Sequence, residues 1–327
     1  MSARSSERPR ADLAVVIVSS PNEPHWLGPA LSSVFAHAGR LALDVVVAQV
    51  QPGDGARELV EVGFPRARVV TCENRGFAYA NNVAWRTCDA RYALFLNPDT
   101  EILDGTLAEL VGWMDQHLGV GLAGVRQVGA DGSLLLTIRR FPSVLRAFGE
   151  ALASERWPFH SSLLGERELR LDLYDRETAC DWTTGSFMLV RREALLGAGL
   201  MDERFFLYRE EVDLCLRIRR AGWEIRHLPL MTILHHADKG EPSERLEAQH
   251  ALSRLLYAEK HFGRLGRAAH RVALGARYGA RSVPLPGSSP ANRAAAAAGL
   301  RITLGSRRVP FPAAAGPAPA RRSSYSA

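Results

Sequence analysis

The chain has 327 residues, of which 46% are hydrophobic and 23% are charged, so it is long enough for one large α/β domain or two small ones with a substantial core. Its four cysteines are widely spaced without a CxxC pair, which argues against a zinc ribbon or a disulfide scaffold and favours a reducing compartment. The net charge is +6, no apolar run approaches the roughly 20 residues of a membrane helix, and no apolar signal segment follows the charged N-terminus. We therefore expect a cytoplasmic protein.

The first hundred residues alternate between strand and helix patterns, after an N-terminus at 1–11 that we expect to be flexible. Residues 12–20 are a continuous apolar run rich in β-branched side chains, which is typical of a buried parallel strand. Similar patterns predict strands at 41–50, 67–72 and 91–96 and helices at 25–38, 56–64 and 76–88. This alternation predicts a doubly wound, mostly parallel sheet, in which ligands bind beyond the carboxyl ends of the strands.

The pattern is less regular after residue 105. We expect a helix over 105–117, strands on both sides of a hairpin at Asp131-Gly132, and an irregular polar stretch over 143–175. The remaining expected elements are a loop, a strand and a short helix over 181–199, an amphipathic helix over 207–223 ended by Gly222, a strand within 225–236 and a helix over 241–262.

The C-terminal region carries the excess positive charge. Residues 264–327 contain eleven arginines and no acidic residue, whereas residues 1–263 contain 30 basic and 35 acidic residues. Such a tail can bind nucleic acid or an anionic membrane surface. The acidic body and the lack of a nucleic-acid-binding motif argue against nucleic acid. We therefore expect the arginine-rich C-terminus to bind an anionic membrane.

Two parts of this region differ in pattern. Residues 264–281 have the pattern of a basic amphipathic helix that lies on a membrane, and a plain surface helix is the alternative. The arginines and His270 would lie on one side, with the apolar residues nearer the other: Leu265, Ala268, Val272 and Tyr278. The stretch 283–327 is rich in Pro, Ala and Gly without periodicity, so we expect it to be disordered.

Asp99 follows the strand at 91–96, directly after a proline. Pro98 removes a backbone donor and fixes the turn, so the Asp99 carboxylate is expected to point out of the sheet. Carboxylate oxygens are preferred ligands of Mg²⁺ and Mn²⁺, so Asp99 is a candidate to hold such a cation against a diphosphate. The alternative is an Asx turn that caps a following helix.

The start of the helix at 76–88 is a second candidate site. Arg75 and the backbone N–H groups after Gly76 can bind phosphate, and the neighbouring asparagines can hydrogen-bond a sugar. These asparagines are Asn74, Asn81 and Asn82. The alternative is a glycine turn followed by a solvated, asparagine-rich helix face.

Three carboxylates, Glu210, Glu211 and Asp213, lie in the first turn of the helix at 207–223, behind an aromatic stretch. A carboxylate beside such a wall can have a raised pKa and act as a general base. The helix dipole and an i,i+4 pair with Arg217 would explain the same acids without catalysis. The His235-His236 pair after the last expected strand can likewise join a metal or diphosphate site or be structural.

Five motifs follow one another along the chain: NRGFAYANN (74–82), FLNPDTEI (95–102), TGSFMLVRREAL (184–195), MDERFFLYREEVDLCLRIRRAGW (201–223) and ILHHADKG (233–240). Together they resemble family 2 inverting glycosyltransferases of the GT-A fold, over roughly residues 12–262. The nearest resemblance is to the rhamnosyltransferase-like branch of bacterial cell-wall and surface-polysaccharide assembly. It implies a GT-A domain over 12–240, with a nucleotide-binding half at 12–105 and an acceptor half at 106–240, followed by C-terminal helices over 241–282.

The resemblance also implies a role for each motif. Asp99 would be the carboxylate of the family's DxD-type motif and would hold Mg²⁺ or Mn²⁺, with His235 or His236 beside it. Glu210 and Glu211 would match the family's acidic pair, whose second member is the base and is usually Asp. The donor nucleotide would be lined by Asn74, Arg75, Asn81, Asn97, Gln49 and Asp54. The donor sugar and the acceptor would face Thr184, Gly185, Ser186, Trp182 and Asp213.

Two departures from the family concern the nucleotide end. Where the family has Asp-Asn before a Ser-x-Asp-Gly turn, this chain has QVQPGDG over 49–55. The family's Asp reads the edge of a pyrimidine, and Gln49 can hydrogen-bond that edge only without charge. The first strand ends in Ser20-Pro21-Asn22 instead of Thr-Tyr-Asn, so the aromatic side chain near the base is missing.

The resemblance implies metal-dependent, inverting transfer of a sugar from a nucleoside diphosphate. The first choice of donor is dTDP-rhamnose, and the acceptor would be a glycan or a polyprenyl-diphosphate-linked sugar at the inner face of the cell membrane. A catalytically silent GT-A-fold scaffold in a glycan-assembly complex is the main alternative, favoured by the altered nucleotide end.

Overall fold

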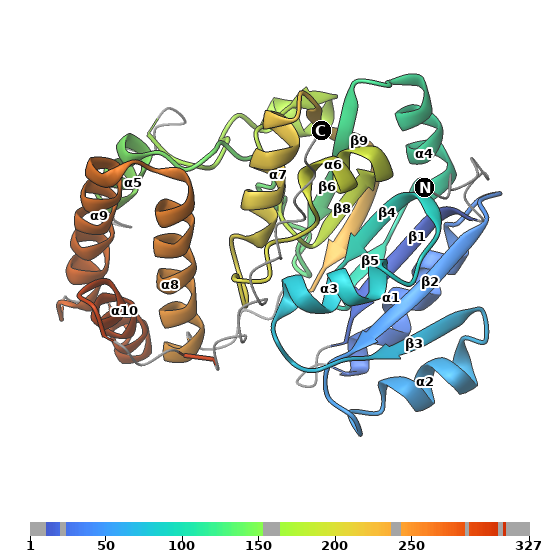
Figure 1. The fold of residues 1–327 in the computed structure, drawn as a ribbon, viewed down its shortest axis with the longest axis horizontal. Helices are drawn as coiled ribbons and strands as arrows, with labels where there is room; N and C mark the ends of the chain where they lie inside the picture. The colour runs from blue at the N-terminus through green and yellow to red at the C-terminus, as the bar shows by residue number, and fades with distance from the viewer. Residues whose placement is uncertain are drawn as a thin grey trace, which may run out of the picture.

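The computed structural model describes residues 11–19, 24–152, 164–236, 243–284, 288–306 and 310–311. They form a β-sheet with helices on both faces and, beside it, a bundle of helices that comes mainly from the C-terminal part of the chain (Figure 1). This is the α/β architecture with a helical C-terminus that the sequence predicts.

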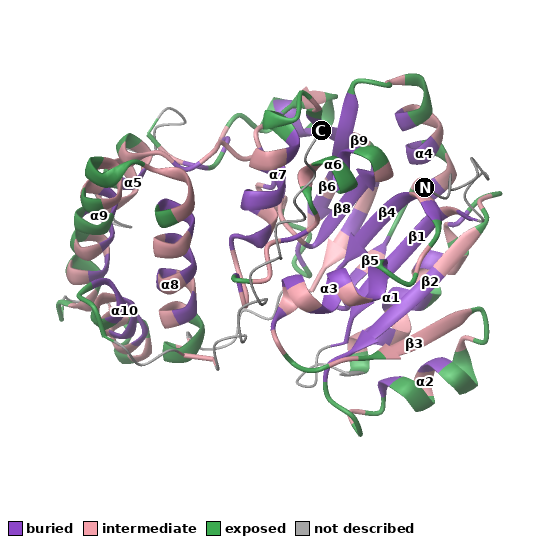
Figure 2. Ribbon diagram, in the orientation of Figure 1, coloured by how far each residue is buried: buried purple, intermediate pink, exposed green. Residues whose placement is uncertain are grey.

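Four parallel strands form one half of the sheet. They are β1 (Ala11–Val18), β2 (Leu43–Gln49), β3 (Ala67–Thr71) and β4 (Ala90–Leu96), in the order β3-β2-β1-β4. β1 and β4 are buried along nearly their whole length, which explains their continuous apolar sequences (Figure 2). Helices α1 (Pro24–Ala36) and α2 (Ala56–Gly63) cover one face, and α3 (Phe77–Trp85) covers the other. The four strands therefore end at one edge, as expected.

The other half of the sheet is mixed. It contains β5 (Thr100–Ile102), β6 (Val120–Val128), β7 (Thr178–Ala179), β8 (Phe187–Arg191) and β9 (Glu224–His235), and the order continues β4-β8-β6-β9-β5, with β7 also paired to β9. β8 runs antiparallel to β4 and β6, whereas β6 and β9 are parallel. Helix α4 (Leu107–Gln116) packs on the α1 face, and α6 (Arg192–Ala198) and α7 (Glu210–Arg220) pack on the α3 face.

The segment after β4 crosses to the far edge of the sheet. It leaves β4 at Asn97 and becomes β5, whose Thr100 pairs with His235 of β9. The crossing brings the carboxyl ends of β4 and β9 together although more than a hundred residues separate them in sequence.

Two helices contradict the sequence-based expectation of irregular or disordered chain. Helix α5 (Val144–Leu152) lies in the stretch expected to be irregular, and α10 (Pro290–Thr303) lies in the stretch expected to be disordered. α10 is alanine-rich, Ser289 caps its first turn, and Pro290 stands at its start, all of which favour a helix. A Cβ on Gly299 would approach the Tyr278 ring to 2.6 Å, so small residues let α10 pack closely. The low sequence complexity of this segment therefore belongs to a tightly packed helix. The last residues, 312–327, lie outside the described part of the chain.

The helical bundle consists of α5, α8 (Glu244–His261), α9 (Arg264–Ser282) and α10. On α9, Leu265 and Val272 are 87% and 62% exposed, whereas His270 and Tyr278 are buried. The expected division of α9 is therefore wrong: His270 faces the bundle together with Tyr278, and Leu265, Ala268 and Val272 share the outer face with exposed arginines. No helix in the described ranges is both long and apolar enough to cross a bilayer.

The expected hairpin at Asp131-Gly132 is only half formed. Gly132 takes a positive φ of 74° and its N–H donates to the Gly129 carbonyl at 2.8 Å, so the tight turn exists. β6 ends before the turn at Val128, and the return strand is reduced to an isolated bridge between Val128 and Leu134. β6 instead pairs with β8 and β9 in the main sheet.

Candidate active site

The turn after β4 presents Asp99 at the edge where the parallel strands end. The Thr100 hydroxyl donates to the Asn97 carbonyl at 2.7 Å and closes the turn. Asp99 is 9% exposed, and its Oδ2 lies 3.3 Å from His235 Nε2. The next element is a strand, and α4 is capped by Thr106, whose hydroxyl accepts from the Glu109 N–H. Asp99 therefore does not cap a helix, and that alternative is wrong.

The two histidines after β9 point to different partners. His235 lies against Asp99, whereas His236 stacks on Trp26 with ring centroids 3.7 Å apart and its Nε2 is 2.5 Å from Glu101 Oε1. Burial alone would raise the pKa of Asp99, but its hydrogen bond to His235, together with electrostatic interactions with His235 and His236 and a backbone hydrogen bond, holds the pKa below the usual value. The carboxylate is thus ionised at neutral pH beside His235, and His236 has structural contacts.

Glu210 and Glu211 begin α7, where Glu210 is buried and Glu211 is half-buried. The residues before them, Tyr208 and Arg209, have φ values of 67° and 72°, a left-handed conformation that costs non-glycine residues on the order of 1–3 kcal/mol each. The Oε2 atoms of both glutamates are buried without a hydrogen-bond partner. Solvated acids that merely complement a helix dipole would not be orphaned in this way, so the strained entry and the orphaned oxygens favour a functional role.

Burial raises the pKa of both carboxyls. The pKa of Glu211 is above its usual value because its carboxyl is desolvated, although the Arg209 guanidinium opposes the shift. Burial and then the charge of Glu211 raise the pKa of Glu210 well above the usual value. Two adjacent acids whose protons are held to different extents can provide one neutral carboxyl and one base.

The segment before β8 touches Glu211. Thr184 and Ser186 form a closed hydrogen-bonded group with the fully buried Gln127 of β6: Ser186 Oγ donates to Gln127 Oε1 at 2.8 Å, and Gln127 Nε2 donates to Thr184 Oγ1 at 3.3 Å. A Cβ on Gly185 would lie 3.6 Å from Glu211 Cβ. The 184–186 segment is therefore held by Gln127 of β6 and lies against Glu211.

Asp99 and Glu211 are joined through this same segment. The Asn97 N–H donates to the Ser186 carbonyl at 3.0 Å, which continues the pairing of β4 with β8. A second link runs from the α3 side, where the Phe77 N–H donates to the Phe206 carbonyl at 2.7 Å. Gly76 has a φ of 101°, and a Cβ there would lie 2.3 Å from the same carbonyl oxygen, so only glycine fits.

The expected nucleotide-end residues form a hydrogen-bonded network at the ends of β1, β2 and β3. Gln49 is buried; its Nε2 donates to Asp54 Oδ1 at 2.7 Å, and its Oε1 accepts from Thr71 Oγ1 at 3.2 Å. The other Asp54 oxygen accepts from Ser19 Oγ at 3.0 Å. Gln49 and Asp54 are thus brought together, and each uses side-chain atoms within the protein.

The residues expected at the start of α3 divide into two groups. Asn74 is exposed, and the Arg75 guanidinium stacks on the Tyr79 ring at 4.4 Å, so both lie near the surface. Asn81 is buried and donates to the Phe77 carbonyl of its own helix at 2.9 Å, although its Oδ1 has no partner. Asn82, the third asparagine of this motif, is buried and holds Met201 through both amide groups.

Asp213, expected at the substrate site, is fully buried. Its carboxylate accepts from Arg217 Nε at 2.8 Å, lies 2.6 Å from Lys260 Nζ and 2.7 Å from His261 Nε2. The expected i,i+4 pair is therefore present, and Asp213 holds α8 against α7. The side chain has no free oxygen for a substrate, because α8 supplies its partners.

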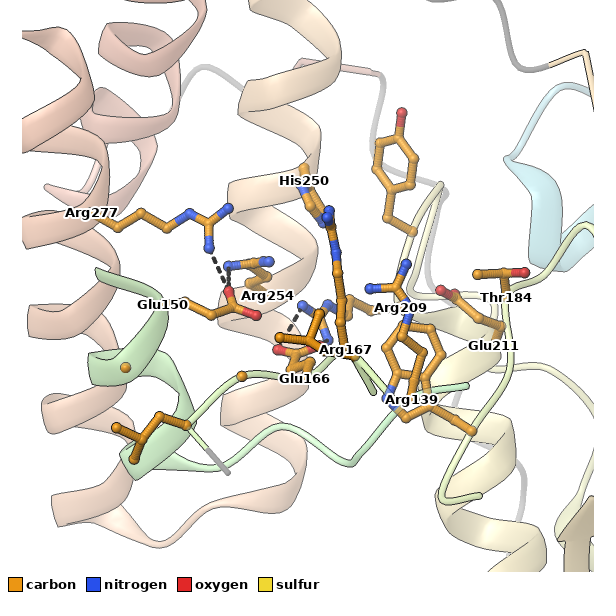
Figure 3. A pocket seen from close by; sticks show the side chains of 16 residues that line it. Arg139, Glu150, Glu166, Arg167, Thr184, Arg209, Glu211, His250, Arg254 and Arg277 are labelled. Atoms are coloured by element: carbon orange, nitrogen blue, oxygen red, sulfur yellow. Dashed lines mark hydrogen bonds and ion pairs between the residues drawn. The ribbon is translucent and has the colours of Figure 1, made fainter. Parts of the chain in front are cut away.

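A cavity of about 550 Å³ opens beside Glu211, between the 181–186 segment and the helical bundle. Figure 3 shows Thr184, Glu211, Arg139 and Arg209 on one side of it and the bundle residues on the other. The predicted Trp182 also lines it; its Nε1 donates to the Arg140 carbonyl at 2.8 Å. The guanidinium groups of Arg139 and Arg209 lie over its ring, with centroid distances of 5.5 and 5.9 Å.

Comparison with known proteins identifies the family. Residues 15–195, more than half of the chain, match the family described as Glycosyl transferase family 2. The chain belongs to this family. The glycosyltransferase is 28% identical over 266 residues to N-acetylglucosaminyl-diphospho-decaprenol L-rhamnosyltransferase of Mycobacterium tuberculosis (strain ATCC 25618 / H37Rv), which covers 77% of this chain and 85% of that protein. It is 29% identical over 173 residues to rhamnosyltransferase WbbL of Escherichia coli (strain K12), 50% of this chain and 61% of that protein.

A solved structure supports the GT-A fold of this glycosyltransferase. Mannosyltransferase PcManGT from Pyrobaculum calidifontis, in complex with GDP-Man and Mn²⁺, superposes with a TM-score of 0.52 at 18% identity and covers 95% of this chain and 79% of that chain. The predicted family, fold class and enzyme class are therefore confirmed.

Two residues that position the candidate site, Gln127 and Glu166, were not expected from the sequence. Gln127 holds the 184–186 segment, and its only sequence signal is an amide beside Arg126 at the end of a mostly apolar strand. Glu166 forms a buried two-bond ion pair with Arg209, at 2.8 and 3.1 Å, across 43 residues. That pairing has no local signal, because the partner comes from a stretch expected to be irregular.

Proposed function

We propose that this glycosyltransferase transfers a deoxyhexose, with dTDP-rhamnose as first choice, from its nucleoside diphosphate to a sugar carried on a polyprenyl diphosphate. The rhamnosyltransferase relatives support the donor sugar, and the name of the mycobacterial relative supports the acceptor. The observation that carries the proposal is the buried Glu211 carboxyl, which faces a cavity on one side and is linked to the Asp99 turn on the other. The product would belong to cell-wall or surface-polysaccharide assembly.

The donor diphosphate would lie at the Asp99 turn. Asp99 and His235 offer one carboxylate and one imidazole at the sheet edge, a donor set that suits Mg²⁺ or Mn²⁺ when diphosphate oxygens complete the coordination. No larger cluster of metal-ligating side chains occurs among the described residues. The cation would neutralise charge on the leaving nucleoside diphosphate. Arg75, half-buried just before α3, would add a guanidinium to the same end.

Glu211 would act as the general base on the acceptor side. Its carboxylate takes the proton of the acceptor hydroxyl while that oxygen attacks the anomeric carbon of the donor sugar. The new bond forms between the acceptor oxygen and the anomeric carbon, and the bond to the diphosphate oxygen breaks on the opposite face. Configuration at the anomeric carbon inverts, and no covalent enzyme intermediate is needed.

The substituted nucleotide end bears on donor choice. In this proposal Gln49 contacts the base as a neutral amide where the family has a charged Asp. The Asp54 carboxylate beside it already accepts hydrogen bonds from Gln49 and Ser19. An enzyme with this end would discriminate between nucleotide bases less strictly, because a neutral amide loses less by facing the wrong edge than a buried carboxylate does.

The enzyme would work at a membrane surface, since a polyprenyl acceptor is anchored there. The outer face of α9 carries exposed arginines beside Leu265 and Val272, a combination that suits an anionic bilayer surface. Peripheral binding through this face is part of the proposal.

The test is a panel of nucleotide sugars with Mg²⁺ or Mn²⁺, scored by nucleoside diphosphate release with and without a short-chain GlcNAc-diphosphate-alkyl acceptor. We expect release that depends on acceptor and is fastest with dTDP-rhamnose. The alternative is a silent GT-A scaffold, favoured by the way Gln49 is satisfied inside the protein. Cation-dependent nucleotide binding without release for any sugar would support that alternative and refute the proposal.

A further inference from the structure

The cavity beside Glu211 carries an excess of positive charge. Five arginines and three glutamates line it. Three of the arginines already have carboxylate partners: Arg209 is paired with Glu166, and Arg254 and Arg277 share Glu150 (Figure 3). Because one carboxylate serves two guanidinium groups at Glu150, even the paired part of the wall is not neutral.

Arg139 and Arg167 have no carboxylate partner. Neither forms an ion pair within the described part of the chain, although both line the cavity. Arg139 Nε is buried without a hydrogen-bond partner, and its guanidinium is held over the Trp182 ring. Arg167 lies beside it through a backbone bridge between the two residues, and its side chain is exposed. A buried guanidinium with an orphaned donor is costly unless an anion completes it.

The protonation of neighbouring groups agrees with a shortage of negative charge. Burial and the nearby Arg167 lower the pKa of Arg139 to about 10, which is the response of a cation without enough compensation. Burial and four arginines, first among them Arg254, hold the pKa of His250 well below its usual value, so this side chain is neutral and adds no charge. The cavity therefore favours an anionic occupant.

We propose that this cavity binds the diphosphate of the acceptor, with Arg139 and Arg167 as its direct ligands. The inference rests on the proposed function for the identity of the acceptor. In a sugar–diphosphate–lipid, both phosphorus atoms are esterified, so the bridge carries two negative charges, which matches the excess of two arginines over glutamates. Binding the bridge here places the attached sugar toward Glu211, which lies in the same cavity.

The donor diphosphate is not the occupant in this arrangement. Asp99 follows β4 and His235 ends β9, and neither lines the cavity. The 184–186 segment stands between the Asp99 turn and Glu211. Two separate diphosphate sites, one on each side of Glu211, give the enzyme distinct places for its anionic donor and anionic acceptor.

The test measures binding of three probes to the full chain and its variants. The probes are GlcNAc-diphosphate bearing a short alkyl chain, the neutral alkyl glycoside of GlcNAc, and dTDP with Mn²⁺. We expect Arg139→Gln to weaken the alkyl-diphosphate probe by about tenfold or more, because a charge-assisted bond from a partly buried guanidinium is lost. Arg167→Gln should weaken it by about threefold to fivefold, because solvent screens the exposed guanidinium of Arg167. The neutral glycoside and dTDP should bind as to the unaltered protein. Arg176→Gln is the matched control, since Arg176 is exposed and paired with Asp172 away from the cavity.

The outcomes separate this inference from the proposed function. Unchanged binding of the alkyl-diphosphate probe in both variants, or no binding to the unaltered protein, overturns the inference even if sugar transfer is observed. Weakened dTDP binding assigns the cavity to the donor and also overturns it. Arginine-dependent binding of the probe without any transfer leaves the inference standing and refutes the function. Phosphatidylglycerol vesicles are the last probe. If Arg167→Gln weakens binding to these vesicles but not to the alkyl-diphosphate probe, Arg167 binds membrane headgroups, and the proposal is overturned.

Folding is controlled within the same set. Arg139 is packed on Trp182, so Arg139→Gln could destabilise the protein, whereas Arg167 has an exposed side chain and Arg167→Gln should leave thermal unfolding unchanged. If only Arg139→Gln unfolds, the Arg167→Gln result decides the question. In the transfer assay, Arg167→Gln should raise the KM for the alkyl-diphosphate acceptor and leave the KM for the donor unchanged.

Discussion

The sharpest prediction concerns the two neighbouring glutamates at the start of α7. Glu211 lines the cavity and would be ionised in the working enzyme, whereas Glu210 lies outside the cavity with a pKa raised further, by burial and by the charge of Glu211. Replacing each by its neutral isostere should therefore have unequal effects. Glu211→Gln removes the proton acceptor, and Glu210→Gln replaces the carboxyl of the pair whose pKa is raised more by burial.

The magnitude for Glu211→Gln follows from what a positioned base contributes. General-base catalysis is worth about 10²- to 10⁴-fold, so we expect kcat to fall by that factor, or about 3–5 kcal/mol of transition-state stabilisation. Donor binding should not change, because Asp99 and His235 lie on the other side of the 184–186 segment. For Glu210→Gln we expect less than a tenfold change in kcat.

The assay is acceptor-dependent release of nucleoside diphosphate from dTDP-rhamnose as a function of pH. The base must be deprotonated, and burial raises the pKa of Glu211, so kcat/KM should fall as the pH drops through a value above the usual 4.5 of a glutamate. This fall in kcat/KM at low pH, the acidic limb of the pH profile, should persist in Glu210→Gln. It should disappear from the residual activity of Glu211→Gln.

Three results would refute this reasoning. One is full transfer by Glu211→Gln, which would remove Glu211 from the base role. Another is a loss in Glu210→Gln as large as in Glu211→Gln, which would mean that the pair acts as a unit. The third is an unchanged acidic limb in Glu211→Gln, which would place the titrating group elsewhere. Titration of dTDP binding and thermal unfolding of both variants control for loss of the fold.

Three further predictions follow from other contacts. His235→Ala should weaken Mn²⁺-dependent dTDP binding at least tenfold, whereas His236→Ala, which loses its stacking on Trp26, should lower the melting temperature with little change in that affinity; equal effects on binding would contradict the assignment. Asp213→Asn should lower the free energy of unfolding by about 1.5–3 kcal/mol, because charge-assisted hydrogen bonds to a fully buried carboxylate are lost while Lys260 keeps its ion pair with Asp202; denaturant titration measures this, and a change below about 0.5 kcal/mol would be incompatible with it. The pKa of Glu150 is lowered to about 2 because Arg254 and Arg277 outweigh its burial, so its contribution to stability is present above the unfolded value near 4.5 and is lost as pH falls toward 2. The stability difference between the unaltered protein and Glu150→Gln should therefore shrink over that window, and a difference independent of pH would contradict the pairing.

The parallel half of the sheet and the position of its carboxyl edge could be predicted because buried parallel strands have a local signature. The runs at 12–20 and 91–96 are apolar without alternation, and both are central strands. The same rule placed Asp99 at a strand end. The acids of α7 were also predictable, because they form the first turn of an amphipathic helix that ends near Gly222.

The rest depended on partners that are distant in sequence. His235 and His236 look alike in the chain, and only the pairing of Thr100 with His235 decides which one meets Asp99. Asp213 was expected at the substrate because it stands near Glu211, yet Lys260 and His261 of α8, more than forty residues later, occupy its carboxylate. Helix α10 was missed because alanine-rich, periodicity-free sequence is shared by disordered tails and by closely packed helices, and only the contact of Gly299 with Tyr278 distinguishes them.

Main-chain hydrogen bonds join the nucleotide-binding half of the site to the acceptor half. They therefore limit which changes at the nucleotide end can disturb the rest of the site. The Asn97 N–H bonds the Ser186 carbonyl, and the Phe77 N–H bonds the Phe206 carbonyl. Main-chain bonds of this kind do not depend on the side chains at Gln49 or at the end of β1, so those residues can change without moving Asp99 relative to Glu211. A departure from the family pattern at the nucleotide end is therefore compatible with intact transfer chemistry. It follows that changes of donor specificity in this enzyme should be sought at Gln49 and Asp54, and changes of acceptor at the cavity beyond Glu211.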